Sequence, residues 1–109
     1  MLNKVLLIGN LARKPEAGDG DKPRTAFTLA TNHWWYSDGE RKEATDFHRI
    51  VAFGSQAERA AGLTKGQLLF VEGRQQTRQW RDGDAKRYIT EVIAARIEIL
   101  ERATSSNEA

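Results

Sequence analysis

Residues 45–54, TDFHRIVAFG, combine features that a strand built only for burial would not need. Successive side chains of an extended strand point to opposite faces, so one face carries Phe47, Arg49, Val51 and Phe53. The opposite face carries His48, Ile50 and Ala52. A core surface has little use for an arginine between two phenylalanines, whereas a surface that stacks bases and meets phosphates uses both groups. The stretch therefore predicts a strand over residues 45–53 with one nucleic-acid-binding face.

The overall composition is typical of a single globular domain. The chain has 109 residues, of which 39% are hydrophobic and 29% charged, so it can enclose one modest core. It has no cysteine, which excludes disulfides and thiolate metal sites and fits a reducing compartment. The apolar run near the N-terminus is too short for a signal peptide or a membrane span. We therefore expect a cytoplasmic protein with no membrane association.

Hydrophobic alternation predicts four further strands, over residues 3–11, 24–36, 67–80 and 86–100. Residues 12–23 and 37–44 are expected to be loops, because they are rich in proline, glycine or charge. A short helix is expected over residues 54–63, with Ser55 as its N-cap and Glu58 completing a capping box. Gly73 predicts a bulge in the fourth strand. The pattern of residues 93–102 also fits a helix, so the end of the last strand stays open.

The order of these elements predicts the fold. Five antiparallel strands with one short helix between the third and the fourth match an all-β OB-fold, a five-stranded Greek-key barrel. We assign residues 1–101 to this domain and residues 102–109 to a short polar tail. The fourth strand is polar on both faces from Gly73 onward, which indicates that it projects beyond the barrel as part of an extended β-hairpin.

The aromatic side chains outnumber what one small core needs. Trp34, Trp35 and Tyr36 are consecutive, so a strand cannot bury all three on one face. Trp80 lies at a strand end, where an indole has little core to enter. We predict that Trp35 and Trp80 stack against bases, a contact that contributes about 1–3 kcal/mol per base.

Positive charge accumulates on the fourth strand and the hairpin that follows it. Net charge is only +2, but residues 74–87 hold five cationic and two anionic side chains. Arg74, Arg78 and Trp80 share one face, so arginines would track a phosphate backbone beside a stacking ring. A solvated hairpin is the alternative interpretation of these charges, and the tryptophan among them favours nucleic acid.

No pattern in the chain indicates catalysis. His33 and His48 lack metal-ligand spacing, and His48 is expected to be hydrogen-bonded at a core edge or a subunit contact. The carboxylates show no catalytic pairing, and no phosphate-binding glycine loop is present. We therefore expect a protein that is not an enzyme and that uses neither a metal nor a cofactor.

Several segments, in order and spacing, resemble the bacterial single-stranded DNA-binding proteins. They are NKVLLIGNL (3–11), FTLAT (27–31), TDFHRIVAFG (45–54), TRQW (77–80) and YITEV (88–92). The resemblance extends from about residue 2 to residue 100. It implies sequence-independent binding and protection of single-stranded DNA in replication, recombination and repair, by a nucleoid-associated homotetramer built from dimers.

The resemblance also implies roles for individual residues. The stacking aromatics would be Trp35, Phe47, Phe53 and Trp80. The basic contacts would be Arg49 and Arg78, with Lys42 or Arg87 in addition, and Arg74 joins them from the strand pattern. His48 would lie near a subunit contact.

Two features depart from this family. Phe47 stands where the family often has tryptophan, which removes a fluorophore but keeps a stacking ring. The family usually continues into a flexible linker and an acidic tip that recruits replication and repair proteins. This sequence ends in SSNEA, so we do not expect recruitment of such partners through a tail.

Three alternatives stay open at the level of sequence. A primosomal replication protein, also short and tailless, would act as an adaptor for replication-restart proteins, although it has less need for four stacking rings. An RNA-binding OB module would use the same surface, because nothing in the sequence reads the 2′-hydroxyl. A nuclease is disfavoured by the lack of clustered metal-binding carboxylates.

Overall fold

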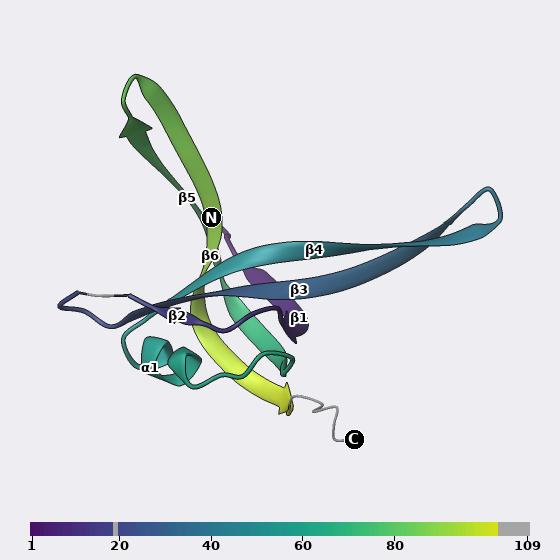
Figure 1. Cartoon of the computed structure of the whole chain (residues 1–109), viewed down its shortest axis with the longest axis horizontal. Coiled ribbons are helices and arrows are strands. Elements are labelled where there is room, and N and C mark those ends of the chain that lie inside the picture. Colours follow the sequence, from purple (N-terminus) through teal and green to yellow (C-terminus); the bar gives the residue numbers. More distant parts are fainter. Residues whose placement is uncertain (19, 103–109) are drawn as a thin grey trace.

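Six strands and one helix make up the part of the chain that the computed structural model describes, residues 1–18 and 20–102. In chain order they are β1 (Val5–Leu11), β2 (Glu16–Ala17), β3 (Arg24–Ser37), β4 (Glu40–Phe53), α1 (Ser55–Ala61), β5 (Leu68–Asp82) and β6 (Ala85–Glu101) (Figure 1). The two-residue strand β2 lies inside the predicted loop 12–23 and was not foreseen. Apart from Arg102, the predicted tail lies outside the described residues.

Five of the strands close into a barrel. The sheet runs β1-β5-β6-β4-β3, and β1 pairs with β3 through Asn10 and Leu11 to complete the ring, while β2 adds to β3. A closed five-stranded barrel with one short helix between β4 and β5 is the architecture of an OB-fold, so the predicted fold is confirmed.

One pair of barrel strands is parallel, so the expectation of five antiparallel strands is wrong at this place. Strand β6 pairs with β4 through Ile50↔Val92 and Val51↔Ile93. The reason is the direction of the chain: β5 and β6 form an antiparallel hairpin after α1, and β6 reaches β4 running in the same direction. We call this short pairing the parallel closure.

Two long hairpins project from the barrel in different directions (Figure 1). The β3–β4 hairpin turns through only two residues, Asp38 and Gly39, both with positive φ (53° and 77°), as a tight two-residue turn requires. The predicted loop over 37–44 is therefore wrong in extent, because charged residues do not end a strand whose faces are both in water. The β5–β6 hairpin turns at Gly83 and Asp84.

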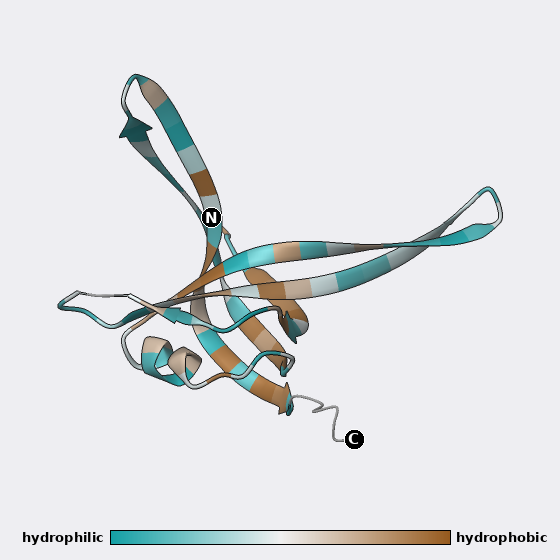
Figure 2. Ribbon diagram, in the orientation of Figure 1, coloured by the Kyte–Doolittle hydropathy of each residue, from teal (hydrophilic) through white to brown (hydrophobic). Residues whose placement is uncertain are grey.

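The core occupies the barrel and the space beneath α1. Its largest fully buried side chains include Leu11, Leu29, Ile50, Leu69, Val71 and Ile97. Ala57 and Ala60 of α1 pack onto the same cluster, and the Thr25 hydroxyl donates a hydrogen bond of 2.8 Å to the Ala57 carbonyl. Hydropathy follows this division: hydrophobic residues concentrate on the barrel strands, and the ends of both hairpins are mainly hydrophilic (Figure 2).

The start of α1 differs from the predicted capping box. The helix begins at Ser55, its N-cap is Gly54, and the N-cap has no side-chain hydrogen bond. Gly54 has a φ of 61°, a conformation that glycine adopts without a Cβ clash, and this bend turns the chain from β4 into the helix. The helical alternative for residues 93–102 is also wrong, because β6 pairs with β5 as far as Glu101.

Gly73 marks the predicted irregularity in β5. The register between β5 and β6 shifts between Glu72 and Gly73, which confirms a bulge. A Cβ at Gly73 would lie 2.1 Å from the carbonyl oxygen of Ile93, so only glycine fits this close approach of two strands.

We expect Gly73→Ala to destabilise the fold by about 1–3 kcal/mol, because the added methyl group would force the backbones of β5 and β6 apart. Urea unfolding of the variant and the wild type measures this loss. Gly62→Ala is the matched control, since the nearest atom to its Cβ would be at 3.8 Å. Equal stability of Gly73→Ala and wild type would contradict the close-approach interpretation.

Candidate nucleic-acid interface

The outward face of β4 carries the side chains that the sequence pattern singled out. Phe47 and Phe53 are 65% and 48% exposed, and Arg49 lies between them, partly exposed. On the opposite face Ile50 and Ala52 are fully buried. Val51 shares the outward side but is buried, because the parallel closure places Ile93 beside it. The face therefore presents two rings and one cation rather than a continuous stripe.

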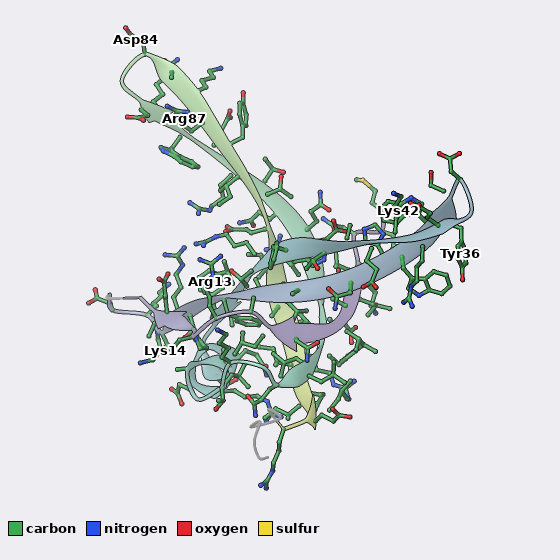
Figure 3. All side chains as sticks on the ribbon, turned by 45° about the vertical axis from the view of Figure 1, so that its right-hand side comes forward. Arg13, Lys14, Tyr36, Lys42, Asp84 and Arg87 are labelled. Carbon is green, nitrogen blue, oxygen red and sulfur yellow. The ribbon has the colours of Figure 1, made fainter. Side chains whose placement is uncertain are left out.

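The β5–β6 hairpin presents a second aromatic and basic face. Trp80 is 46% exposed, and the Arg78 guanidinium lies 5.8 Å from its ring centroid. Arg87 is the cross-strand partner of Trp80, and its Nε lies 3.6 Å from a carboxylate oxygen of Asp82. Arg74 is exposed on the same side, nearer the barrel. Figure 3 shows Arg87 near the end of this hairpin, beside the turn that holds Asp84.

Trp35 is exposed but does not share a face with Phe47. The register pairs Ala30 with Phe47 and Trp35 with Lys42, so alternation puts Trp35 on the other side of the hairpin. There its ring stacks on His33, with centroids 5.4 Å apart. The structure therefore separates Trp35 from the Phe47–Phe53 face.

Trp34 and Tyr36, the neighbours of Trp35 in sequence, lie on the same face of the hairpin as Phe47. Their rings meet edge to face at 5.5 Å, and the Arg41 guanidinium lies 4.8 Å from the Trp34 ring. Figure 3 shows Tyr36 and Lys42 on opposite sides of the hairpin. Sequence reasoning missed this pair, because the assumed long loop over 37–44 hid the register across the turn.

His48 is hydrogen-bonded, as predicted. Its Nε2 lies 2.8 Å from the hydroxyl oxygen of Thr31 on β3, and the side chain is half-buried. This contact fixes the imidazole at the edge of the core. Its predicted place at a subunit contact stays a prediction.

Two cations in the loop after β1 were not foreseen. Arg13 and Lys14 line a pocket of about 230 Å³ together with Thr28 and Arg49. Glu16 contributes one carboxylate to the same pocket. Figure 3 shows Arg13 and Lys14 beside the barrel end of the β3–β4 hairpin. The signal in the sequence was the adjacent basic pair in a loop, which the pattern analysis did not use.

The two central arginines of the site share one buried carboxylate. Glu91 on β6 is 3% exposed and accepts a hydrogen bond from Arg49 Nε at 3.0 Å and one from Arg78 Nε at 2.6 Å. Each arginine uses a different carboxylate oxygen. Glu91 thus joins β4 and β5 through β6, and sequence reasoning gave it no role.

Burial of Glu91 opposes its ionisation, but the hydrogen bonds from Arg78 and Arg49 outweigh burial and hold the pKa of this carboxyl below its usual range. A carboxyl whose pKa is lower in the folded state stabilises the fold above its unfolded pKa. This contribution is lost as the pH falls through the folded pKa.

We therefore expect Glu91→Gln to be less stable than wild type at pH 7, by about 1–3 kcal/mol, because an arginine loses its hydrogen-bond partner. The difference should shrink as the pH falls through the lowered pKa of Glu91, since the wild-type carboxyl becomes protonated there. Thermal unfolding at pH 7 and at successively lower pH measures the stability difference between the variant and the wild type. A difference that does not change with pH would contradict the role of Glu91 ionisation.

Two further findings concern residues 1–18 and 20–102, the part of the chain that the structure describes. In this part of the chain no group of three His, Asp or Glu side chains lies close enough to hold a metal ion. No helix among these residues is long and apolar enough to cross a membrane.

Known proteins resemble this chain in sequence and in structure. The single-stranded DNA-binding protein 1 of Chlorobaculum tepidum is 42% identical over 106 residues, which cover 91% of this chain and 65% of that protein. The chain thus spans just under two thirds of the length of this curated relative.

Two solved structures match with a TM-score of 0.81. One is the Plasmodium falciparum SSB in complex with ssDNA, 31% identical over 93% of this chain and 96% of that chain. The other is a deletion mutant of the single-stranded DNA binding protein from Thermus aquaticus, 36% identical over 92% of this chain and 51% of that chain. The model of the single-strand binding protein family matches residues 2–100. Because this family model covers nearly the whole chain and a curated relative is 42% identical, the chain belongs to the single-strand binding protein family.

Proposed function

We propose that this protein binds single-stranded DNA without sequence preference. Bases stack on Trp35, Phe47, Phe53 and Trp80, and phosphates pair with Arg49, Arg74, Arg78 and Arg87. The observation that carries the proposal is the exposure of four large aromatic rings, three of which (Phe47, Phe53 and Trp80) lie on strand faces that also carry arginines. Such rings are costly to leave in water, and base stacking covers them with any sequence, because every base has a π-face.

The comparisons support the same ligand. The Plasmodium falciparum relative was solved with ssDNA bound, and it matches nearly the whole of this chain. Residues 1–101 would form the DNA-binding domain. Arg13 and Lys14 would add phosphate contacts at the barrel end of the path, because they share a pocket with Arg49.

We propose that the protein assembles as a homotetramer built from dimers. Leu6 and Ile8 on β1 are exposed, and Ile99 and Leu100 add to the apolar surface at the end of β6. Exposed apolar side chains of this extent are typical of an interface between protein chains. His48 would lie near such a subunit contact.

The cellular role follows from the ligand. The protein would protect single strands during replication, recombination and repair, as a cytoplasmic, nucleoid-associated protein without catalytic activity. The adaptor alternative gains no support from the structure, since exposed stacking rings serve DNA more directly than they serve an adaptor.

Titration with oligo-dT should quench tryptophan fluorescence, and the affinity should fall as salt rises. Trp80→Ala should weaken binding to all sequences alike, by about 1–3 kcal/mol, because a stacking platform is lost. Tyr88→Ala is the control, since Tyr88 lies on the opposite face of the same hairpin, across from Gln79.

The absence of quenching at low salt would contradict the proposed function. Loss of affinity for only some sequences in Trp80→Ala would indicate reading of base edges instead. A matched RNA oligonucleotide that competes better than DNA would favour the RNA-binding alternative.

A further inference from the structure

Glu91 carries a negative charge at a position where negatively charged DNA phosphates are proposed to bind. It is buried between Arg49 and Arg78, two arginines proposed to contact phosphate. A carboxylate placed there reduces the attraction of the pair for DNA. Its presence therefore needs a compensating role.

The parallel closure explains how the three side chains meet. Ile50 pairs with Val92 and Val51 with Ile93, so Arg49 and Glu91 sit just before equivalent positions on two adjacent strands. Arg78 reaches the same carboxylate from β5, where its cross-strand partner is Ile89. The three groups thus come from β4, β5 and β6.

The hydrogen bonds to Glu91 do not use the Nη groups of either arginine. Each guanidinium donates to Glu91 through Nε, and the two Nη groups make the fork that binds phosphate oxygens in pairs. Both side chains remain partly exposed, at 37% for Arg49 and 42% for Arg78. Glu91 therefore holds the arginines by their inner edges.

We propose that Glu91 is a positioning residue that orients Arg49 and Arg78 toward the DNA backbone and lowers the net charge they present from +2 to +1. This inference rests on the proposed function. Binding then depends more on directed hydrogen bonds and less on diffuse electrostatic attraction. The affinity for DNA therefore falls less steeply with salt than it would if both arginines were free of Glu91.

Replacement by glutamine separates these effects. A glutamine side chain offers one acceptor oxygen, and its NH₂ group cannot accept from a guanidinium. One arginine would be released, and the local charge would rise by one. The number of counterions displaced by DNA should rise accordingly.

The test is the slope of log affinity against log salt for oligo-dT, measured on the full chain. Glu91→Gln should steepen the slope by about 0.7, which is a loss of affinity about threefold larger than in wild type between 50 and 200 mM salt. Glu72→Gln is the matched control: Glu72 is on β5 and pairs with Lys4 at 2.8 Å, away from the two arginines. It changes net charge equally and should keep the wild-type slope.

An unchanged or shallower slope in Glu91→Gln overturns the inference, as does equal steepening in Glu72→Gln, because net charge alone would then be responsible. Failure of the wild type itself to bind overturns the proposed function, and the inference with it.

Glu91→Asp is a second variant that retains the charge but shortens the reach. It should bind more weakly at every salt concentration, with the wild-type slope, because it cannot hold both arginines. Wild-type affinity in Glu91→Asp would overturn the positioning role even if Glu91→Gln does not fold.

Discussion

Four strands of this protein are longer than the barrel that they build. Strands β3, β4, β5 and β6 have 14, 14, 15 and 17 residues, and the core covers only the part of each that lies in the barrel. Beyond the barrel, both faces of each strand are in contact with water. Side chains on either face can therefore contact a ligand. These extensions carry Trp35, Trp80, Arg78 and Arg87. The barrel part of β4 carries Phe47, Arg49 and Phe53 on its outward face, because Phe47 pairs with Ala30 of β3, which itself pairs with Asn10 of β1.

Part of the candidate site lies directly at the parallel closure. There β4 and β6 pair through Ile50↔Val92 and Val51↔Ile93, which makes this a short link in the ring. Directly beside it, Glu91 bridges Arg49 and Arg78. A buried carboxylate with two guanidinium partners satisfies its own charge and links three strands. Under the proposed function, the stability of the closure and the geometry of DNA contact would be coupled through this one side chain.

The sequence alone predicted those features of the fold that depend only on the alternation of neighbouring side chains. The strand over residues 45–53, with Ile50 and Ala52 inward and Phe47 outward, needs only the period of two, and the bulge at Gly73 needs only a glycine inside a strand. The faces of Trp34 and Trp35 relative to Phe47 depend on the register across a turn, and the turn was two residues where a loop was expected. The role of Glu91 depends on contacts between strands 13 and 42 residues apart in the chain, which no local pattern reveals. The prediction of Ser55 as the N-cap was wrong for a related reason. The helix begins after a bend at Gly54, and the direction of β4 in the barrel determines that bend.

The central claim is that single-stranded DNA runs over the exposed rings of the two hairpins. Ultraviolet cross-linking of oligo-dT to the protein, followed by mass spectrometry of the peptides, tests it most directly. The account predicts cross-links at Trp35, Phe47, Phe53 and Trp80. Cross-links confined to the apolar surface around Leu6 and Ile8, with none on the hairpins, would contradict it.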